Sequence, residues 1–153
     1  MAKKPLAELR VLVVDDSQVV RSLVRSALRE MGIFETIEAT NGLEALRWLE
    51  REMFDLVISD LNMPQMNGLQ LLVRLRTGDW QKQTPFVMLT ADGNKENVLE
   101  AVKQGASSYI VKPFTADTIQ GKVMQVLGAK VKEEGLPGRP VGNKSQTGSR
   151  NET

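Results

Sequence analysis

The chain has 153 residues, a length that suits one domain with a short tail, and it contains neither cysteine nor histidine. These absences exclude a disulfide, a thiolate metal site, a Ser-His-Asp triad and a phosphohistidine on this chain. The formal net charge of +1 predicts no strong attraction to nucleic acid or membrane, and no apolar run approaches the roughly 20 residues that span a bilayer, so we expect a cytoplasmic protein.

The first strand is expected over residues 9–14, a continuous apolar run that is typical of a strand buried on both faces. Ser17 then occupies the position of a helix N-cap. Apolar residues recur at helical spacing from Val20 to Met31, and Gly32 ends the helix. These segments predict one strand–helix unit.

The same alternation recurs four more times along the chain. Strands are expected over 34–39, 56–59, 86–90 and 108–111, and helices begin at Asn41–Gly42, Asn67–Gly68, Asn94 and Thr115. Strands that alternate with helices favour an α/β fold with a parallel sheet. A closed barrel usually needs eight such units, so five units predict an open, doubly wound sheet of five parallel strands in the flavodoxin-like order 2-1-3-4-5.

The composition changes after Gly128, where glycine, proline, serine and other polar residues replace large apolar ones. Such a segment cannot bury enough apolar surface to offset the entropy of ordering it. We therefore expect an N-terminal extension at 1–8, a folded domain at 9–128 and a disordered tail at 129–153. The tail is too short for a second folded domain, so we expect no fused DNA-binding module.

Polar residues follow four of the predicted strands at their carboxyl ends, the edge of a parallel sheet where ligands bind. They are Asp15, Asp16, Asp60, Thr90 and Lys112. Taken singly, each has an ordinary structural interpretation as a turn, cap or loop residue. Three carboxylates that lie close together repel one another, however, and Mg²⁺ removes that conflict. The pattern predicts a Mg²⁺ site, with Asp60 on the central strand as a nucleophile that forms an acyl phosphate.

The remaining roles follow from this arrangement. Asp16 is expected to bind the ion directly, and Asp15 directly or through water, with the Asn62 carbonyl as a further ligand oxygen. The Lys112 ammonium would neutralise charge on the transferring phosphoryl oxygens, and the Thr90 hydroxyl would donate a hydrogen bond to one of them.

Four segments, VVDDS, ISDLNMPQMNG, MLTADGNKEN and ASSYIVKPF, resemble in order the motifs of receiver domains of two-component signalling, most closely the stand-alone chemotaxis regulators of the CheY type. The resemblance covers residues 9–127. It implies Asp60 as the phosphoacceptor, with Mg²⁺ ligands at Asp15, Asp16, Asp60 and Asn62, and phosphoryl contacts by Thr90, Ala91 and Lys112. It also implies that Tyr109 is an aromatic switch, whose ring moves inward when Thr90 turns toward the phosphate.

The resemblance also implies an output surface on the fourth helix, the fifth strand and the fifth helix, with the residues Lys95, Val98, Tyr109, Val111 and Lys122. Lys95 and Lys122 are equally consistent with ordinary solvated helix positions. The implied partners are a histidine kinase, a flagellar motor switch protein and a phosphatase. We expect a monomer that catalyses only its own phosphorylation and dephosphorylation.

Three alternative functions compete with this interpretation. A single-domain phosphorelay or phosphate-sink receiver with other partners stays open. A flavin-binding protein is disfavoured, because its phosphate loop would follow the first strand, where DDSQVVR is acidic. A haloacid-dehalogenase-type phosphatase is disfavoured because Asn62 stands where its second aspartate, the general acid, belongs.

The lifetime of the phosphoryl group is a further expectation. By resemblance, Asn62 and Asp92 flank the path of the attacking water, and both are polar and small enough to let water approach. We therefore expect a short-lived phosphoryl group on Asp60. Asp92 has an alternative role as a cap of the following helix.

Overall fold

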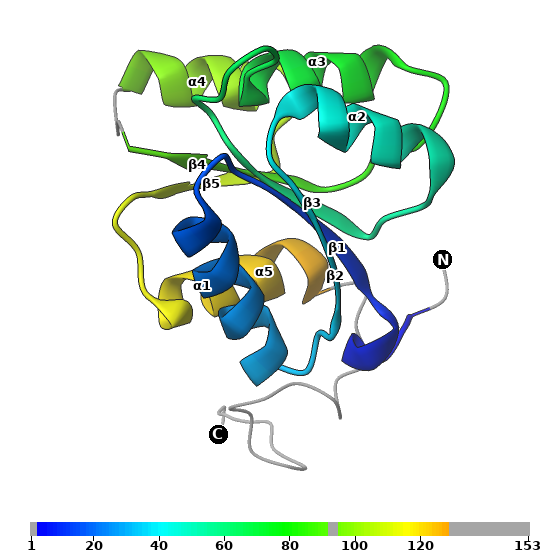
Figure 1. The fold of residues 1–153 in the computed structure, drawn as a ribbon, viewed down its shortest axis with the longest axis vertical. Helices are drawn as coiled ribbons and strands as arrows, with labels where there is room; N and C mark the ends of the chain where they lie inside the picture. Colours follow the sequence, from blue (N-terminus) through cyan, green and yellow to red (C-terminus); the bar gives the residue numbers. More distant parts are fainter. Residues whose placement is uncertain (1–2, 92–94, 129–153) are drawn as a thin grey trace, which may run out of the picture.

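The structure, a computed structural model, describes residues 3–91 and 95–128. Five parallel strands of this part form one sheet in the order β2-β1-β3-β4-β5 (Figure 1). They are β1 (Arg10–Val14), β2 (Glu35–Ala39), β3 (Leu56–Asp60), β4 (Phe86–Thr90) and β5 (Ser108–Val111). The predicted doubly wound α/β fold with flavodoxin-like strand order is confirmed. The predicted tail at 129–153 lies outside the described residues.

The helices cover both faces of this sheet. They are α1 (Gln18–Glu30), α2 (Gly42–Arg51), α3 (Gly68–Thr77), α4 (Lys95–Lys103) and α5 (Ala116–Leu127). Figure 1 shows α1 and α5 on one face and α2, α3 and α4 on the other, in agreement with two separate hydrophobic clusters. Within β1, Val11 and Val13 belong to the first cluster and Leu12 and Val14 to the second, so the strand is buried on both faces as its apolar run predicts.

The predicted helix starts coincide with side-chain caps. Ser17, Asn41 and Thr115 each accept a hydrogen bond from a backbone N–H in the first turn of the helix that follows. Asn67 and Gln70 form a reciprocal capping box at the start of α3. These caps set where each helix leaves the carboxyl edge of the sheet, and thereby fix the loops that carry the polar residues.

A few boundaries differ from those predicted. β1 begins at Arg10 because the Leu9 N–H closes a short 3-10 helix, η1 (Leu6–Glu8), by donating to the Leu6 carbonyl. Leu6 is only 3% exposed and packs into the core, so residues before the first strand contribute to the domain. β2 begins one residue later than predicted, at Glu35, and β3 extends by one residue to include Asp60.

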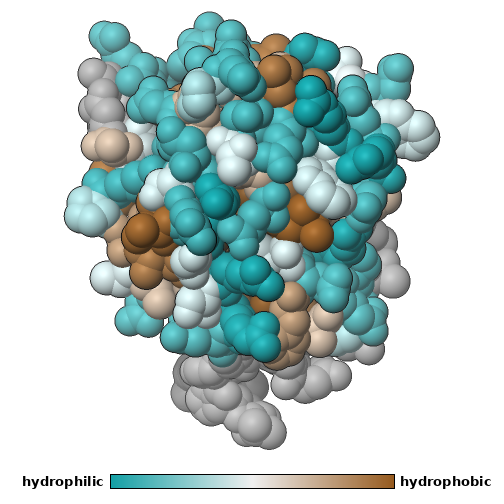
Figure 2. Space-filling model, in the orientation of Figure 1, coloured by the Kyte–Doolittle hydropathy of each residue, from teal (hydrophilic) through white to brown (hydrophobic). Residues whose placement is uncertain are grey.

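The exterior of the domain is mostly polar. The face drawn in Figure 2 is largely hydrophilic and is interrupted by separate hydrophobic patches. Among the helices of the described residues, none has the length and apolar character required to cross a membrane.

Candidate functional site

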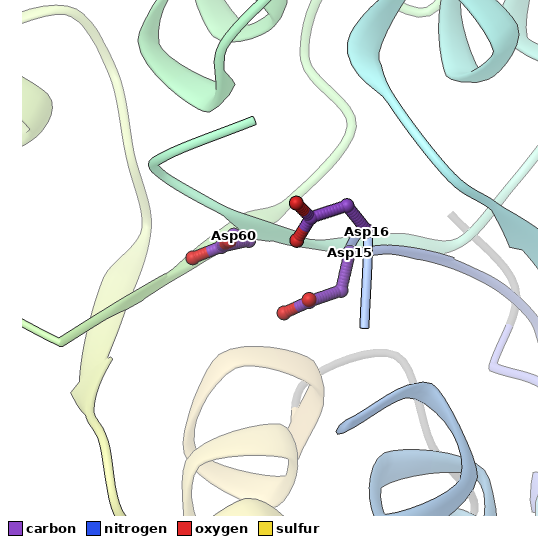
Figure 3. Close-up of side chains that lie close together, drawn as sticks. All are labelled: Asp15, Asp16 and Asp60. Carbon is purple, nitrogen blue, oxygen red and sulfur yellow. The ribbon is translucent and has the colours of Figure 1, made fainter. Parts of the chain in front are cut away.

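Three carboxylates converge at the carboxyl edge of the sheet (Figure 3). Asp15 and Asp16 follow β1, and Asp60 is the last residue of the neighbouring strand β3. One oxygen of each lies within 4.8 Å of the others. Asp15 and Asp60 are 0% and 5% exposed, whereas Asp16 is exposed. The cluster is therefore half enclosed, with Asp16 on its solvent side.

Lys112 connects two of these carboxylates. It follows β5, and its ammonium nitrogen lies 3.0 Å from Asp15 Oδ2 and 3.2 Å from Asp60 Oδ1. The other oxygen of Asp15 accepts a hydrogen bond of 2.8 Å from the Ser17 N–H, so both oxygens of this carboxylate are held. The predicted convergence of Asp15, Asp16, Asp60 and Lys112 on one edge of the sheet agrees with this geometry.

Electrostatics makes this cluster a site that favours an added cation. Burial, and then the negative charge of Asp15, raise the pKa of Asp60 above its usual value, against the opposing effects of Lys112 and of a backbone hydrogen bond from Asn62. Burial alone would lower the pKa of Lys112, but its contacts with Asp15 and Asp60 outweigh that effect and raise it. Lys112 therefore stays charged, yet one ammonium cannot neutralise three carboxylates.

The donor set fits Mg²⁺, which prefers carboxylate oxygens and retains several waters. The carboxylates of Asp15, Asp16 and Asp60 would hold the ion, with exposed Asp16 leaving room for water. Asn62 is exposed and lies two residues beyond Asp60. Its carbonyl as a further ligand stays a prediction.

Thr90 and Ala91 reach the same edge from β4. Thr90 ends that strand and is only 2% exposed, and its carbonyl accepts a 2.7 Å hydrogen bond from the Lys112 N–H. Because β4 pairs with β3 on one side and with β5 on the other, Thr90 lies between the strands that carry Asp60 and Lys112. Ala91 is exposed, whereas Asp92 lies outside the described residues.

The loop after Asp60 is held by a close approach that the sequence analysis missed. A Cβ atom added to Gly68 would lie only 2.2 Å from the Asp60 carbonyl oxygen. The Gly68 N–H donates to the Leu61 carbonyl at 2.9 Å, which folds the loop back on itself. The sequence indicated Gly68 only as the opening of a helix, because nothing local reveals how near the chain passes to Asp60.

Tyr109 and its neighbours form an exposed surface on β5 and α5. Tyr109 is 37% and Val111 40% exposed, and the Lys122 ammonium lies 5.8 Å from the centroid of the Tyr109 ring. The ring therefore points outward in this structure. Val98 is half buried, and the side chain of Lys95 lies outside the described part of the chain.

α4 adds two exposed apolar side chains that the sequence analysis did not single out. Leu99 is 55% and Val102 51% exposed. The signal was present, because Val98, Leu99, Ala101 and Val102 cover more of the helix circumference than one buried stripe requires.

Comparison with known proteins gives a consistent result. The family model described as "Response regulator receiver domain" matches residues 11–124. Chemotaxis protein CheY-3 of Vibrio cholerae is 41% identical over 118 residues, which are 77% of this chain and 91% of that protein. Chemotaxis protein CheY1 of Helicobacter pylori is 39% identical over 78% of this chain and 98% of its own length.

One of the similar solved structures has a sequence identity to this chain close to that of the two relatives above. The chemotaxis response regulator CheY4 of Vibrio cholerae superposes with a TM-score of 0.73 and 37% sequence identity, and the match covers 78% of this chain and 98% of that one. The fold and the sequence thus point to the same group of proteins.

Proposed function

The chain belongs to the response regulator receiver domain family, with CheY-like chemotaxis proteins among its relatives, and on this basis we propose that it is a single-domain response regulator phosphorylated on Asp60. Receiver domains are phosphoacceptor signalling modules rather than metabolic enzymes. The observation that carries the proposal is the placement of Asp60, nearly buried and in contact with Lys112, beside two further carboxylates. The same proposal includes a cytoplasmic location.

In the proposed reaction, an Asp60 carboxylate oxygen attacks the phosphorus atom of a phosphohistidine on a histidine kinase. An O–P bond forms as the P–N bond breaks, and the imidazole leaves with the electron pair of that bond. Lys112, already 3.2 Å from Asp60, neutralises charge on the phosphoryl oxygens, and the Thr90 hydroxyl donates a hydrogen bond to one of them. Bound Mg²⁺ supplies further neutralisation and relieves the repulsion among the carboxylates.

The output of this reaction is a change in the surface around Tyr109. We expect Thr90 to turn toward the phosphoryl group and the Tyr109 ring to move inward. Val111 on β5, and Leu99 and Val102 on α4, add exposed apolar side chains to this part of the fold, and exposed apolar area is suited to a protein partner. The relatives are named as chemotaxis proteins, and we propose a flagellar motor switch protein as that partner.

Hydrolysis of the phosphoryl group on Asp60 would return the protein to its unphosphorylated state. Asn62 is exposed beside Asp60, and Ala91 is small and exposed, so water and a partner phosphatase have access to the acyl phosphate. We propose that Asn62 and Asp92 orient the attacking water, and that the phosphorylated state is therefore short-lived.

Labelling with acetyl phosphate tests the phosphoacceptor directly. In Mg²⁺, the intact mass of the parent should rise by one phosphoryl group, whereas Asp60→Asn should not be labelled because its amide is a poor nucleophile. Asp79→Asn is the matched control, since Asp79 is exposed in a loop outside the cluster. Equal labelling of Asp60→Asn and Asp79→Asn would contradict the proposal.

A further inference from the structure

Arg21, on α1, bridges the carboxylate cluster and the edge strand β2. Its Nη1 donates to the Asp15 backbone carbonyl at 2.8 Å, and its Nε donates to Glu38 Oε1 at 2.9 Å. The Arg21 side chain is only 13% exposed. An arginine on a surface helix commonly extends into solvent, so a guanidinium held at two points on the protein indicates a defined structural task.

That task concerns the backbone between the first two carboxylates. The Asp15 N–H donates to the Ala39 carbonyl, and both its carboxylate oxygens are held by Ser17 and Lys112. The Arg21 bond also holds the Asp15 carbonyl. This carbonyl belongs to the planar peptide unit that joins Asp15 to Asp16, so fixing it fixes the direction in which Asp16 leaves the strand.

We propose that Arg21, anchored by Glu38, is a positioning residue of the cation site: it fixes the Asp15–Asp16 peptide and thereby aims the Asp16 carboxylate toward Asp60. Asp16 is exposed, and Figure 3 shows its carboxylate directed to the same space as those of Asp15 and Asp60. The inference rests on the proposed Mg²⁺ site and adds a residue that does not itself touch the ion.

Arg25 provides a matched control in the same helix. Its Nη1 lies 3.1 Å from the other oxygen of Glu38, but its side chain is 52% exposed. Within the described residues, the Arg25 guanidinium donates its hydrogen bond to Glu38 and not to Asp15. Arg25→Gln therefore removes the same charge and a bond to the same partner, without releasing the Asp15 carbonyl.

Charge and position predict opposite results for Arg21→Gln. Removing the Arg21 positive charge takes away a Coulomb repulsion on Mg²⁺, so charge alone should tighten Mg²⁺ binding. Releasing the Asp15–Asp16 peptide should weaken it, by about 10-fold, the lower end of the losses caused by removing outer-shell partners of metal ligands. Arg21→Lys keeps the charge but cannot span both acceptors, so it should also weaken binding. Arg25→Gln should stay within about two-fold of the parent, because exposed ion pairs contribute little.

Calorimetric Mg²⁺ titration of the full chain tests the inference, at a temperature where circular dichroism shows each variant folded. Weaker binding by Arg21→Gln and Arg21→Lys, with Arg25→Gln like the parent, supports it. If Arg21→Gln binds Mg²⁺ as tightly as Arg25→Gln does, the positioning role of Arg21 is overturned. The proposed Mg²⁺ site itself still stands in that case, provided that the parent protein binds Mg²⁺. A parent that does not bind Mg²⁺ overturns the site and the inference together.

A second variant tests the contact between Arg21 and Glu38. Glu38→Ala removes the anchor and leaves Arg21 and its charge in place. It should weaken Mg²⁺ binding in the same direction as Arg21→Gln, and it decides the question if Arg21→Gln does not fold. Parent-like Mg²⁺ affinity in folded Glu38→Ala overturns the proposed role of the anchor.

Discussion

Replacing Asp16 by asparagine removes one charge from the carboxylate cluster and keeps the side-chain volume. The carboxylate oxygens of Asp15, Asp16 and Asp60 lie within 4.8 Å of one another. Two unit charges at that distance repel by about 1 kcal/mol in water and by about 3.5 kcal/mol at an effective dielectric constant of roughly 20. Asp16 is exposed, and Lys112 contacts the other two carboxylates, so the lower value applies.

In EDTA, the free energy of unfolding of Asp16→Asn should therefore exceed that of the parent by about 1 kcal/mol. This corresponds to a melting temperature higher by about 4 °C for a domain of this size. In Mg²⁺ the order should reverse. A parent at an ion concentration about 100-fold above its Kd gains about 2.7 kcal/mol, and the variant gains much less because it has lost a ligand.

Urea unfolding followed by far-ultraviolet circular dichroism, in EDTA and in Mg²⁺, measures both effects. Asp79→Asn removes an exposed aspartate outside the cluster and should behave like the parent in both conditions. The reasoning is refuted if Asp16→Asn is less stable than the parent in EDTA, or if Mg²⁺ stabilises the variant as much as the parent.

Three further predictions address the same site. First, burial and the Asp15 charge raise the pKa of Asp60, so the folded chain holds this proton more tightly than the unfolded chain. In EDTA, the free energy of unfolding should fall as the pH rises from about 3.9 through the pKa of Asp60 in the folded chain, and Asp60→Asn should lack this contribution to the pH dependence. The same pH dependence in the parent and in Asp60→Asn would contradict the raised pKa. Second, Gly68→Ala places a Cβ 2.2 Å from the Asp60 carbonyl oxygen, so urea unfolding should show a loss of about 1–3 kcal/mol, and parent-like stability would argue against the close approach. Third, Lys112→Ala should still accept phosphate from acetyl phosphate but lose the phosphorylation-dependent change in hydrogen exchange at β5; an unchanged response would exclude Lys112 as the link.

The convergence of the acidic residues could be predicted from the sequence because it depends on topology alone. In a parallel sheet, the residue that follows each buried strand lies at one edge, so Asp15, Asp60, Thr90 and Lys112 could be assigned to that edge from their places after apolar runs. The N-caps at Ser17, Asn41, Asn67 and Thr115 were predictable for a different reason, because capping is a local property of the chain.

The contacts that support the site could not be predicted in this way. Arg21 has the spacing of an ordinary exposed helix residue, and its bond to Asp15 depends on how α1 lies over β1. Glu38 anchors it from a strand 17 residues farther along the chain. Likewise, the cis peptide bond at Lys112–Pro113 has no signal in the sequence beyond the proline itself.

Side-chain exposure on the helices was predicted less well than helix position. Leu23 has the helical spacing of the buried residues Val24 and Leu28, yet it is 53% exposed. Leu99 of α4 is likewise exposed, whereas the sequence pointed to Val98. Helical spacing alone does not say how wide the buried stripe is, since that width depends on the elements that pack against it.

Peptide mapping of the phosphorylated chain tests the central claim most directly. After incubation with Mg²⁺ and acetyl phosphate, the phosphoryl group should be found on Asp60 alone, and EDTA should abolish the labelling. Recovery of the group on Asp15, Asp16 or a residue outside the cluster, or full labelling in EDTA, would contradict the assignment of Asp60 as a Mg²⁺-dependent phosphoacceptor.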